Sequence, residues 1–189
     1  MRVLVLGGTR FIGRALTMRL LREGHEVHLL TRTREHAAFA PAAIVHPGDR
    51  REPAALASVT GYFDVIYDFL GFDANDAHVA CFAFAGRCRR LVHLSTGSVY
   101  WVASVRNCPW IETDGTLPLR DRAACDRAEF DYGVAKRECE QVYREAAGQS
   151  YDWAEFNLAC LMLDGKGVPQ DRDGAFALFT KAAAQGHVK

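Results

Sequence analysis

The chain has 189 residues, of which 49% are hydrophobic and 24% are charged, a composition typical of a soluble globular protein. Lysine plus arginine equal aspartate plus glutamate at 23 each, so the net charge of zero gives no general attraction to nucleic acid or to an anionic membrane. No apolar run approaches the ~20 residues that cross a bilayer, and the first apolar run is too short for a signal peptide. We therefore expect a cytoplasmic protein that does not bind a membrane.

Cysteines and histidines are scattered along the chain. No two cysteines have the short spacing of zinc sites or redox motifs, so we expect reduced thiols, mostly filling the core, and no metal site. The six cysteines are Cys81, Cys88, Cys108, Cys125, Cys139 and Cys160.

Short apolar runs alternate with helical patterns over the first 150 residues. The first run, residues 3–6, is apolar without alternation, which is typical of a strand buried on both faces. Strand patterns occur at 3–6, 26–31, 43–46, 64–70 and 91–95, and helical patterns at 11–22, 53–59, 74–85 and 130–147. This order predicts right-handed crossovers and a doubly wound parallel sheet of the Rossmann type, an α/β fold.

Two other stretches break this alternation. Residues 101–126 contain prolines, a glycine and many polar residues, and we expect a loop that lies over a site. After the break at 148–150 the patterns at 153–163 and 174–184 are helical, and no strand pattern follows residue 95. We therefore divide the chain into a nucleotide-binding domain, 1–149, and an α-helical hairpin, 150–189.

A glycine-rich turn joins the first strand to the first helix. Gly7 permits the tight turn, and Gly13 lets the helix lie close to the sheet with its positive N-terminal end toward a phosphate. An ordinary tight turn is the alternative, but a buried strand before the loop and a helix after it favour a dinucleotide site. The expected loop contacts are Gly7, Gly8, Thr9, Arg10, Phe11, Ile12 and Gly13.

Residues 3–32 resemble the opening of the extended short-chain dehydrogenases/reductases, the NAD(P)-dependent epimerase/dehydratase family. That family's loop usually reads Gly-x-x-Gly-x-x-Gly, and Arg10 stands at the middle glycine position here. A branch of the family with Gly-Gly-Thr-Arg-Phe-Ile-Gly looks similar. The resemblance implies a Rossmann domain that binds a nicotinamide dinucleotide, with a guanidinium beside its phosphates.

The end of the second predicted strand favours NADP over NAD. NAD-binding proteins usually carry a carboxylate there, whereas this chain has Arg32 and Arg34, which suit a 2′-phosphate unless they are merely solvated. Asp49 matches the family's usual aspartate beside the adenine ring, with a turn or helix cap as an equally weighted alternative.

Tyr132 and Lys136 lie four residues apart and therefore on one face of the last predicted helix of this domain. An ammonium near a phenol stabilises the phenolate, so the tyrosine can exchange a proton with a substrate hydroxyl or carbonyl. A surface pair is the alternative for this common spacing. The resemblance implies a catalytic pair in which Lys136 also holds the cofactor ribose.

The ends of the fourth and fifth predicted strands complete the expected site. The segment at 94–100 resembles the family's Ser-Ser/Thr-x-x-Val-Tyr-Gly motif, which assigns the substrate-binding hydroxyl to Thr96, with Ser95 as the neighbour that could be confused with it. The family's final glycine is Trp101 here. By position, the residues after the fourth strand lie along the cofactor; they are Phe69, Leu70 and Gly71.

The resemblance to dehydrogenases ends near residue 147, without the family's sixth strand or substrate domain. Residues 152–187 instead resemble one Sel1-like repeat, a helical unit related to tetratricopeptide repeats. Such repeats bury their faces on neighbours, so we expect it to pack on the nucleotide-binding domain or on another chain. We suspect a fusion or a piece of a longer protein.

Three functions follow from these patterns. The first is an NAD(P)-dependent oxidoreductase or epimerase acting on a sugar-nucleotide-like carbonyl or hydroxyl, with its substrate domain missing. The second is a non-catalytic nucleotide-binding scaffold whose helical repeat binds a protein partner. The third is RNA binding, because the Arg10 branch resembles chloroplast stem-loop RNA-binding proteins; the neutral net charge disfavours it.

Overall fold

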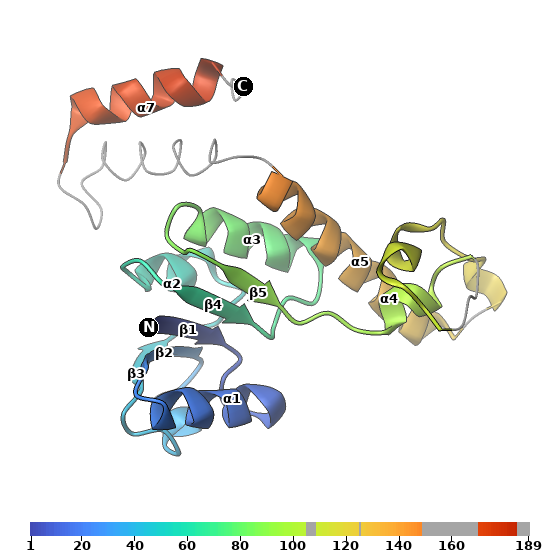
Figure 1. Cartoon of the computed structure of the whole chain (residues 1–189), viewed down its shortest axis with the longest axis horizontal. Coiled ribbons are helices and arrows are strands. Elements are labelled where there is room, and N and C mark those ends of the chain that lie inside the picture. Colours follow the sequence, from blue (N-terminus) through green and yellow to red (C-terminus); the bar gives the residue numbers. More distant parts are fainter. Residues whose placement is uncertain (105–108, 125, 149–169, 185–189) are drawn as a thin grey trace.

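The computed structural model describes residues 1–104, 109–124, 126–148 and 170–184. Five parallel strands form one sheet in the order β3-β2-β1-β4-β5, which confirms the expected doubly wound α/β fold (Figure 1). The strands are β1 (Arg2–Leu6), β2 (Glu26–Thr31), β3 (Ile44–Pro47), β4 (Val65–Asp68) and β5 (Leu91–His93).

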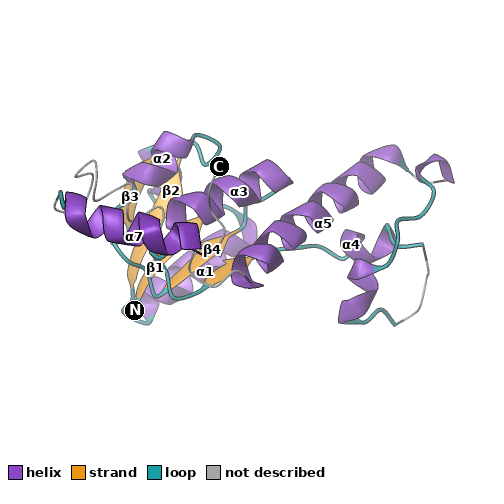
Figure 2. Cartoon of the chain, turned by 90° about the horizontal axis from the view of Figure 1, so that it is seen from above, coloured by secondary structure: helices purple, strands orange, loops and turns teal. Residues whose placement is uncertain are grey.

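Helices cover both faces of this sheet. Helix α1 lies on one face, whereas α2, α3 and α5 lie on the other (Figure 1). The α-helices are α1 (Phe11–Arg22), α2 (Pro53–Ser58), α3 (Ala74–Phe84), α4 (Ser98–Trp101), α5 (Arg127–Gly148) and α7 (Arg172–Ala184), and the 3-10 helices are η1 (Arg34–Ala37), η2 (Glu112–Thr116) and η3 (Arg122–Ala124). Helix α5 extends past the end of β5 (Figure 1), and α4 lies against its projecting part (Figure 2).

Strand β1 explains why the first apolar run does not alternate. Leu4 and Leu6 join the core beneath α2 and α3, whereas Val3 and Val5 join the core beneath α1. All four side chains are fully buried. A strand covered on both faces needs apolar residues at every position, which fixes β1 at the centre of the sheet.

Local differences from the expected elements lie mainly in the segment after β5. Helix α4 ends at Trp101, the first residue of the expected loop, and an isolated antiparallel bridge joins Ala103 to Leu119 within that loop. Helix α5 begins at Arg127, three residues before the predicted start. The expected helix at 153–163 lies outside the described residues, and α7 covers the expected helix at 174–184.

A buried ion pair ties the sheet to the helices above it. Asp68, at the end of β4, is fully buried and accepts from Arg50 Nη2 at 2.5 Å and from the Tyr143 hydroxyl at 2.8 Å. Arg50 Nη1 also donates to the backbone oxygen of Asp76 at 2.7 Å. These contacts connect the loop after β3 with β4, α3 and α5.

Removing the cation from this pair should destabilise the fold. We expect Arg50→Met to lower the free energy of unfolding by about 3 kcal/mol, because Asp68 then stays buried without its counter-ion. The matched control is the neighbouring Arg51→Met, since the Arg51 side chain is 63% exposed and its ion pairs are 3.6 and 3.8 Å long. Its cost should stay below about 1 kcal/mol. Urea unfolding of both variants checks this, and equal losses would contradict the assignment.

Candidate functional site

The glycine-rich loop leaves β1 and turns directly into α1. Gly7 has a φ of +86°, a left-handed conformation that favours glycine. A Cβ on Gly13 would lie 2.2 Å from the Gly7 carbonyl oxygen, so only glycine lets α1 pack this closely against the loop. The geometry is a cradle of backbone that side chains cannot fill.

The start of α1 keeps its backbone N–H groups free of side-chain caps. Arg10 is the N-cap residue with extended backbone, it makes no side-chain cap hydrogen bond, and the first turn has no acidic residue. Phe11 has a φ of 43° and is 90% exposed, and Ile12 is 61% exposed. An uncapped helix start beside arginines is an arrangement that suits an anion.

Thr17 supports the loop from inside α1 and was missed by sequence reasoning. Its buried hydroxyl donates to the Gly8 carbonyl oxygen at 3.1 Å. Gly13, Thr17 and Leu20 are the buried residues of α1, whereas the apolar Ile12 and Ala15 are exposed. In the sequence, a single threonine in this helix does not indicate a hydrogen bond to the Gly8 carbonyl.

The segment after β4 lies beside the glycine-rich loop, as its position in the sequence predicts. A Cβ on Gly7 would lie 2.7 Å from Leu70 Cγ and 3.2 Å from Phe69 Cβ. The Leu70 amide donates to Asp68 Oδ1 at 2.9 Å, which fixes the turn. Phe69, Leu70 and Gly71 therefore form one wall of the candidate cofactor site.

Lys136 lies where the ends of β4 and β5 meet α5. Its side chain is 2% exposed, and Nζ donates to the carbonyl oxygens of Gly71 and Leu94, each at 2.6 Å. Nζ also lies 3.1 Å from His93 Nε2. Burial lowers the pKa of Lys136 below its usual value, against the opposing effect of nearby Asp68 and Glu140.

One face of α5 carries several polar contacts with the ends of β4 and β5 and the loops that follow them. Tyr132, Lys136, Cys139 and Tyr143 recur at the three- and four-residue spacing of a single helix face. Lys136, Cys139 and Tyr143 reach the loops after β4 and β5, whereas Tyr132 is one turn closer to the helix start and 40% exposed. The predicted Tyr132–Lys136 pair thus has its lysine anchored and its phenol at the surface.

The two candidate hydroxyls after β5 have different hydrogen-bond partners. Ser95 Oγ donates to the carboxylate of Glu140 on α5. Thr96 Oγ1 lies 3.3 Å from both Ser98 Oγ and the Ser98 amide, at the start of α4. Because Ser95 is already bonded to a carboxylate, Thr96 is the better candidate for a substrate contact.

Arg32 and Asp49 lie at the ends of β2 and β3. Arg32 follows β2 and is exposed. Asp49 Oδ1 accepts from the Arg51 amide at 2.9 Å, which is the turn contact that the sequence left as the alternative. Both residues sit at the edge of the sheet that carries the glycine-rich loop, because parallel strands end on the same side.

The polar network beneath this site was not predicted. It joins Arg50, Asp68, Tyr143 and His93, and the His93 and Tyr143 rings lie 4.8 Å apart. Burial, with Asp68 adjacent, raises the pKa of Tyr143, and burial together with Lys136 lowers the pKa of His93 to about 4. A charged residue inside an apolar strand was the one available signal, because such a residue needs a buried partner.

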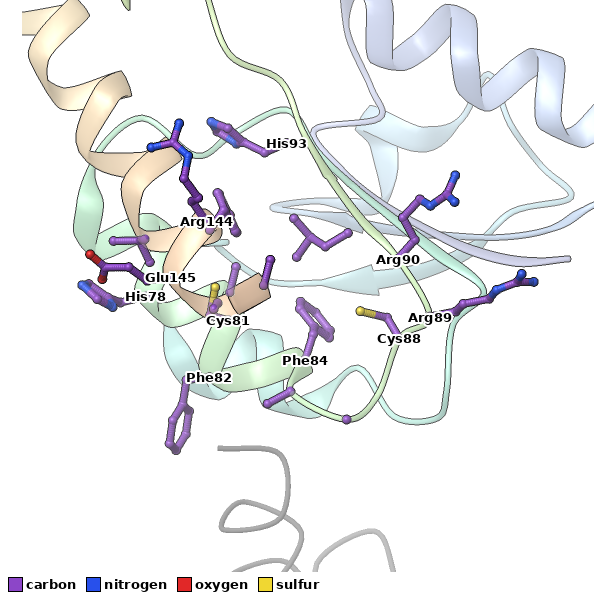
Figure 3. A pocket seen from close by; sticks show the side chains of 18 residues that line it. His78, Cys81, Phe82, Phe84, Cys88, Arg89, Arg90, His93, Arg144 and Glu145 are labelled. Carbon is purple, nitrogen blue, oxygen red and sulfur yellow. The ribbon is translucent and has the colours of Figure 1, made fainter. Parts of the chain in front are cut away.

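A separate groove of about 980 Å³ lies between α3, β5 and the last turns of α5 (Figure 3). His93 and Tyr143 contribute to its lining, but none of the predicted site residues does. Within the parts of the chain that are described, no group of three histidine, cysteine or carboxylate residues could hold a metal ion. Over the same residues, no helix has both the length and the apolar character to cross a membrane.

Comparisons with known proteins identify a similar curated sequence, similar solved structures and a matching family. The curated chloroplast stem-loop binding protein of 41 kDa b from Arabidopsis thaliana is 29% identical over 132 residues, covering 62% of this chain and 34% of that protein. The chain therefore spans about a third of the length of this relative.

Solved structures share the fold. A UDP-glucose 4-epimerase from Bifidobacterium longum in complex with NAD⁺ and UDP has a TM-score of 0.62 at 19% identity, over 81% of this chain and 51% of that one. A wide-type short-chain dehydrogenase/reductase from Veillonella parvula in complex with NADP has a TM-score of 0.54 at 18% identity, over 76% of this chain and 64% of that one.

The family match covers most of the chain. The matched range, residues 3–189, continues past residue 147, where the resemblance read from the sequence ends. With the five-stranded parallel sheet and the glycine-rich loop in place, the chain belongs to the NAD dependent epimerase/dehydratase family.

Proposed function

We propose that the chain binds a nicotinamide dinucleotide, NADP in preference to NAD, at the carboxyl edge of its sheet. The observation that carries this proposal is the approach of Gly13 to the Gly7 carbonyl beneath an uncapped start of α1. Such a cradle admits a pyrophosphate where side chains would block it. The residues present therefore fit the group that the family name implies.

Each part of the cofactor has residues to hold it. The glycine-rich loop and Arg10 would hold the pyrophosphate, Arg32 the 2′-phosphate and Asp49 the adenosine end. Phe69, Leu70 and Gly71 would line the nicotinamide half, and Lys136 would turn one N–H group from its present acceptors to the ribose. When bound, the nicotinamide supplies a hydride donor or acceptor.

The catalytic part of the proposal assigns proton transfer to this chain's own residues. Tyr132 would exchange a proton with a substrate hydroxyl or carbonyl, Thr96 would orient that oxygen, and the Lys136 ammonium would stabilise the phenolate. The substrate class is a sugar nucleotide, supported by the UDP-sugar epimerases that share this fold. The cytoplasm as the place of this protein in the cell stays a prediction.

RNA binding is the second candidate, because the curated relative is named as a stem-loop binding protein. The zero net charge speaks against it, since RNA binding relies on neutralising phosphates. Saturable binding of a stem-loop RNA without binding of a dinucleotide would favour this candidate. The scaffold with a Sel1-like repeat becomes the leading proposal if neither ligand binds.

Gly13→Asp should abolish cofactor binding. The new side chain would collide with the Gly7 carbonyl and would place a negative charge at the phosphates, so we expect NADPH to bind about 100-fold more weakly or not at all. Fluorescence titration with NADPH and NADH measures this, and circular dichroism reports whether the variant folds. Gly115→Ala is the control, because Gly115 lies in η2 and its added Cβ would make only an ordinary contact with Tyr100, at 3.4 Å. A folded Gly13→Asp that binds as the wild type does would overturn the proposal.

Arg32→Ala should change the preference between the two nucleotides. Loss of a charged hydrogen bond to the 2′-phosphate should raise the Kd for NADPH about tenfold and leave the Kd for NADH unchanged. The same titration measures both constants. The control is Arg19→Ala, which removes an exposed arginine paired with Glu23 on α1. Equal effects on both nucleotides would remove the argument for NADP.

Tyr132→Phe should separate catalysis from cofactor binding. Without the phenolic proton we expect kcat to fall by about 100-fold or more, with the Kd for NADPH unchanged. Conversion of UDP-glucose or UDP-galactose, followed by chromatography, measures turnover. Tyr62→Phe is the control, since Tyr62 is also exposed, at 54%, but lies before β4. A wild-type chain that binds NADPH and converts neither sugar nucleotide would contradict the catalytic part.

A further inference from the structure

The Lys136 ammonium has as many acceptors as it has N–H groups. Gly71 and Leu94 offer backbone oxygens at 2.6 Å, and His93 offers Nε2 at 3.1 Å. An ammonium carries three donors and no acceptor. Two of the three partners are backbone carbonyls, so His93 is the single side chain that completes the set.

The chemistry of this contact fixes the state of His93. Nε2 accepts from an ammonium only when its lone pair is free, which places the imidazole proton on Nδ1. Burial and the nearby Lys136 lower the pKa of His93 to about 4, so the ring is neutral at pH 7. Nδ1 is buried and has no hydrogen-bond partner among the described residues, so the bond to Lys136 is what orients the ring's polar atoms.

The position of the His93 ring is set by its neighbours. Figure 3 shows the ring pointing from the end of β5 toward α5, where it packs against Tyr143 at 4.8 Å. The Tyr143 hydroxyl is itself held by Asp68 at 2.8 Å. On the other side, a Cβ on Gly71 would lie 2.9 Å from His93 Cε1, so a glycine at this position makes room for the ring.

We propose that His93 is a positioning residue that holds Lys136 in its charged form at the candidate active site. The other charged or titratable groups that face Lys136 are Asp68 on β4, Cys139 and Glu140 on its own helix, and Arg50 in the loop after β3. The structure gives none of them a hydrogen bond to Nζ, so their influence acts through space. His93 adds a directional acceptor that exists only while its ring is neutral.

The effect of this inference on catalysis rests on the proposed function. The proposed function needs a charged Lys136 on the helix face of Tyr132, so a residue that keeps the ammonium protonated extends the pH range of proton transfer. Loss of the His93 acceptor destabilises the charged form of Lys136, and its proton then leaves at a lower pH. The alkaline limb of turnover should move to lower pH by the same amount.

The titration of Lys136 tests the proposal without any cofactor. The chain has four lysines, Lys136, Lys166, Lys181 and Lys189, so lysine side-chain NMR is simple, and Lys136→Met assigns the signal. We expect His93→Phe, which keeps an aromatic ring beside Tyr143, to lower the pKa of Lys136 by about one unit, the loss expected for a hydrogen bond to a charged group. His93→Gln, which retains an acceptor, should restore most of the wild-type value.

The control is His78→Phe, because His78 lines the same groove but is exposed on α3. An unchanged Lys136 titration in a folded His93→Phe would overturn the proposal, as would an equal fall in His93→Gln. If His93→Phe does not fold, ¹⁵N NMR of the wild-type imidazole decides: we expect a proton on Nδ1 and a bare Nε2 at pH 7. A proton on Nε2 would overturn the proposal. Failure to bind NADPH would remove the proposed function and leave these NMR results valid.

Discussion

The candidate site depends on the hydrogen bonds of one fully buried carboxylate, that of Asp68. It stands at the end of β4 and is bonded by Arg50 from the loop after β3, by Tyr143 from α5 and by the Leu70 amide that follows it. A buried charge is tolerated only when its hydrogen bonds are satisfied, so these elements must meet at one place. The wall formed by Phe69, Leu70 and Gly71 follows from that requirement.

The same buried hydrogen bonds also fix helix α5, which carries two of the candidate catalytic residues. Tyr143 anchors one end of its inner face to Asp68, and Lys136 two turns earlier is anchored to the loops after β4 and β5. A rigid helix then sets the place of Tyr132 one further turn along. The phenol stays partly exposed because the helix runs past the end of β5 at that point (Figure 1).

The two halves of the candidate site use different physical means. The cofactor half depends on a close backbone approach, with Gly13 against the Gly7 carbonyl at an uncapped helix start. The lysine of the candidate catalytic pair belongs to a set of buried polar groups whose protonation is controlled by burial, as the lowered pKa values of Lys136 and His93 indicate. Both halves lie at the carboxyl ends of the parallel strands, which is where open α/β sheets bind their ligands.

The sequence by itself determined the fold and the local geometry of the glycine-rich loop. Unbroken apolar runs such as the one in β1 follow from burial on both faces, and Gly7 and Gly13 are needed by backbone geometry that is local in the chain. Only the tertiary structure decided the network of Arg50, Asp68, Tyr143 and His93, and the hydrogen bond from Ser95 to Glu140. These contacts join residues far apart in sequence, from 18 positions between Arg50 and Asp68 to 75 between Asp68 and Tyr143. Periodicity and local spacing carry no record of such pairs, because partners of a buried charge are selected by the packing of separate elements.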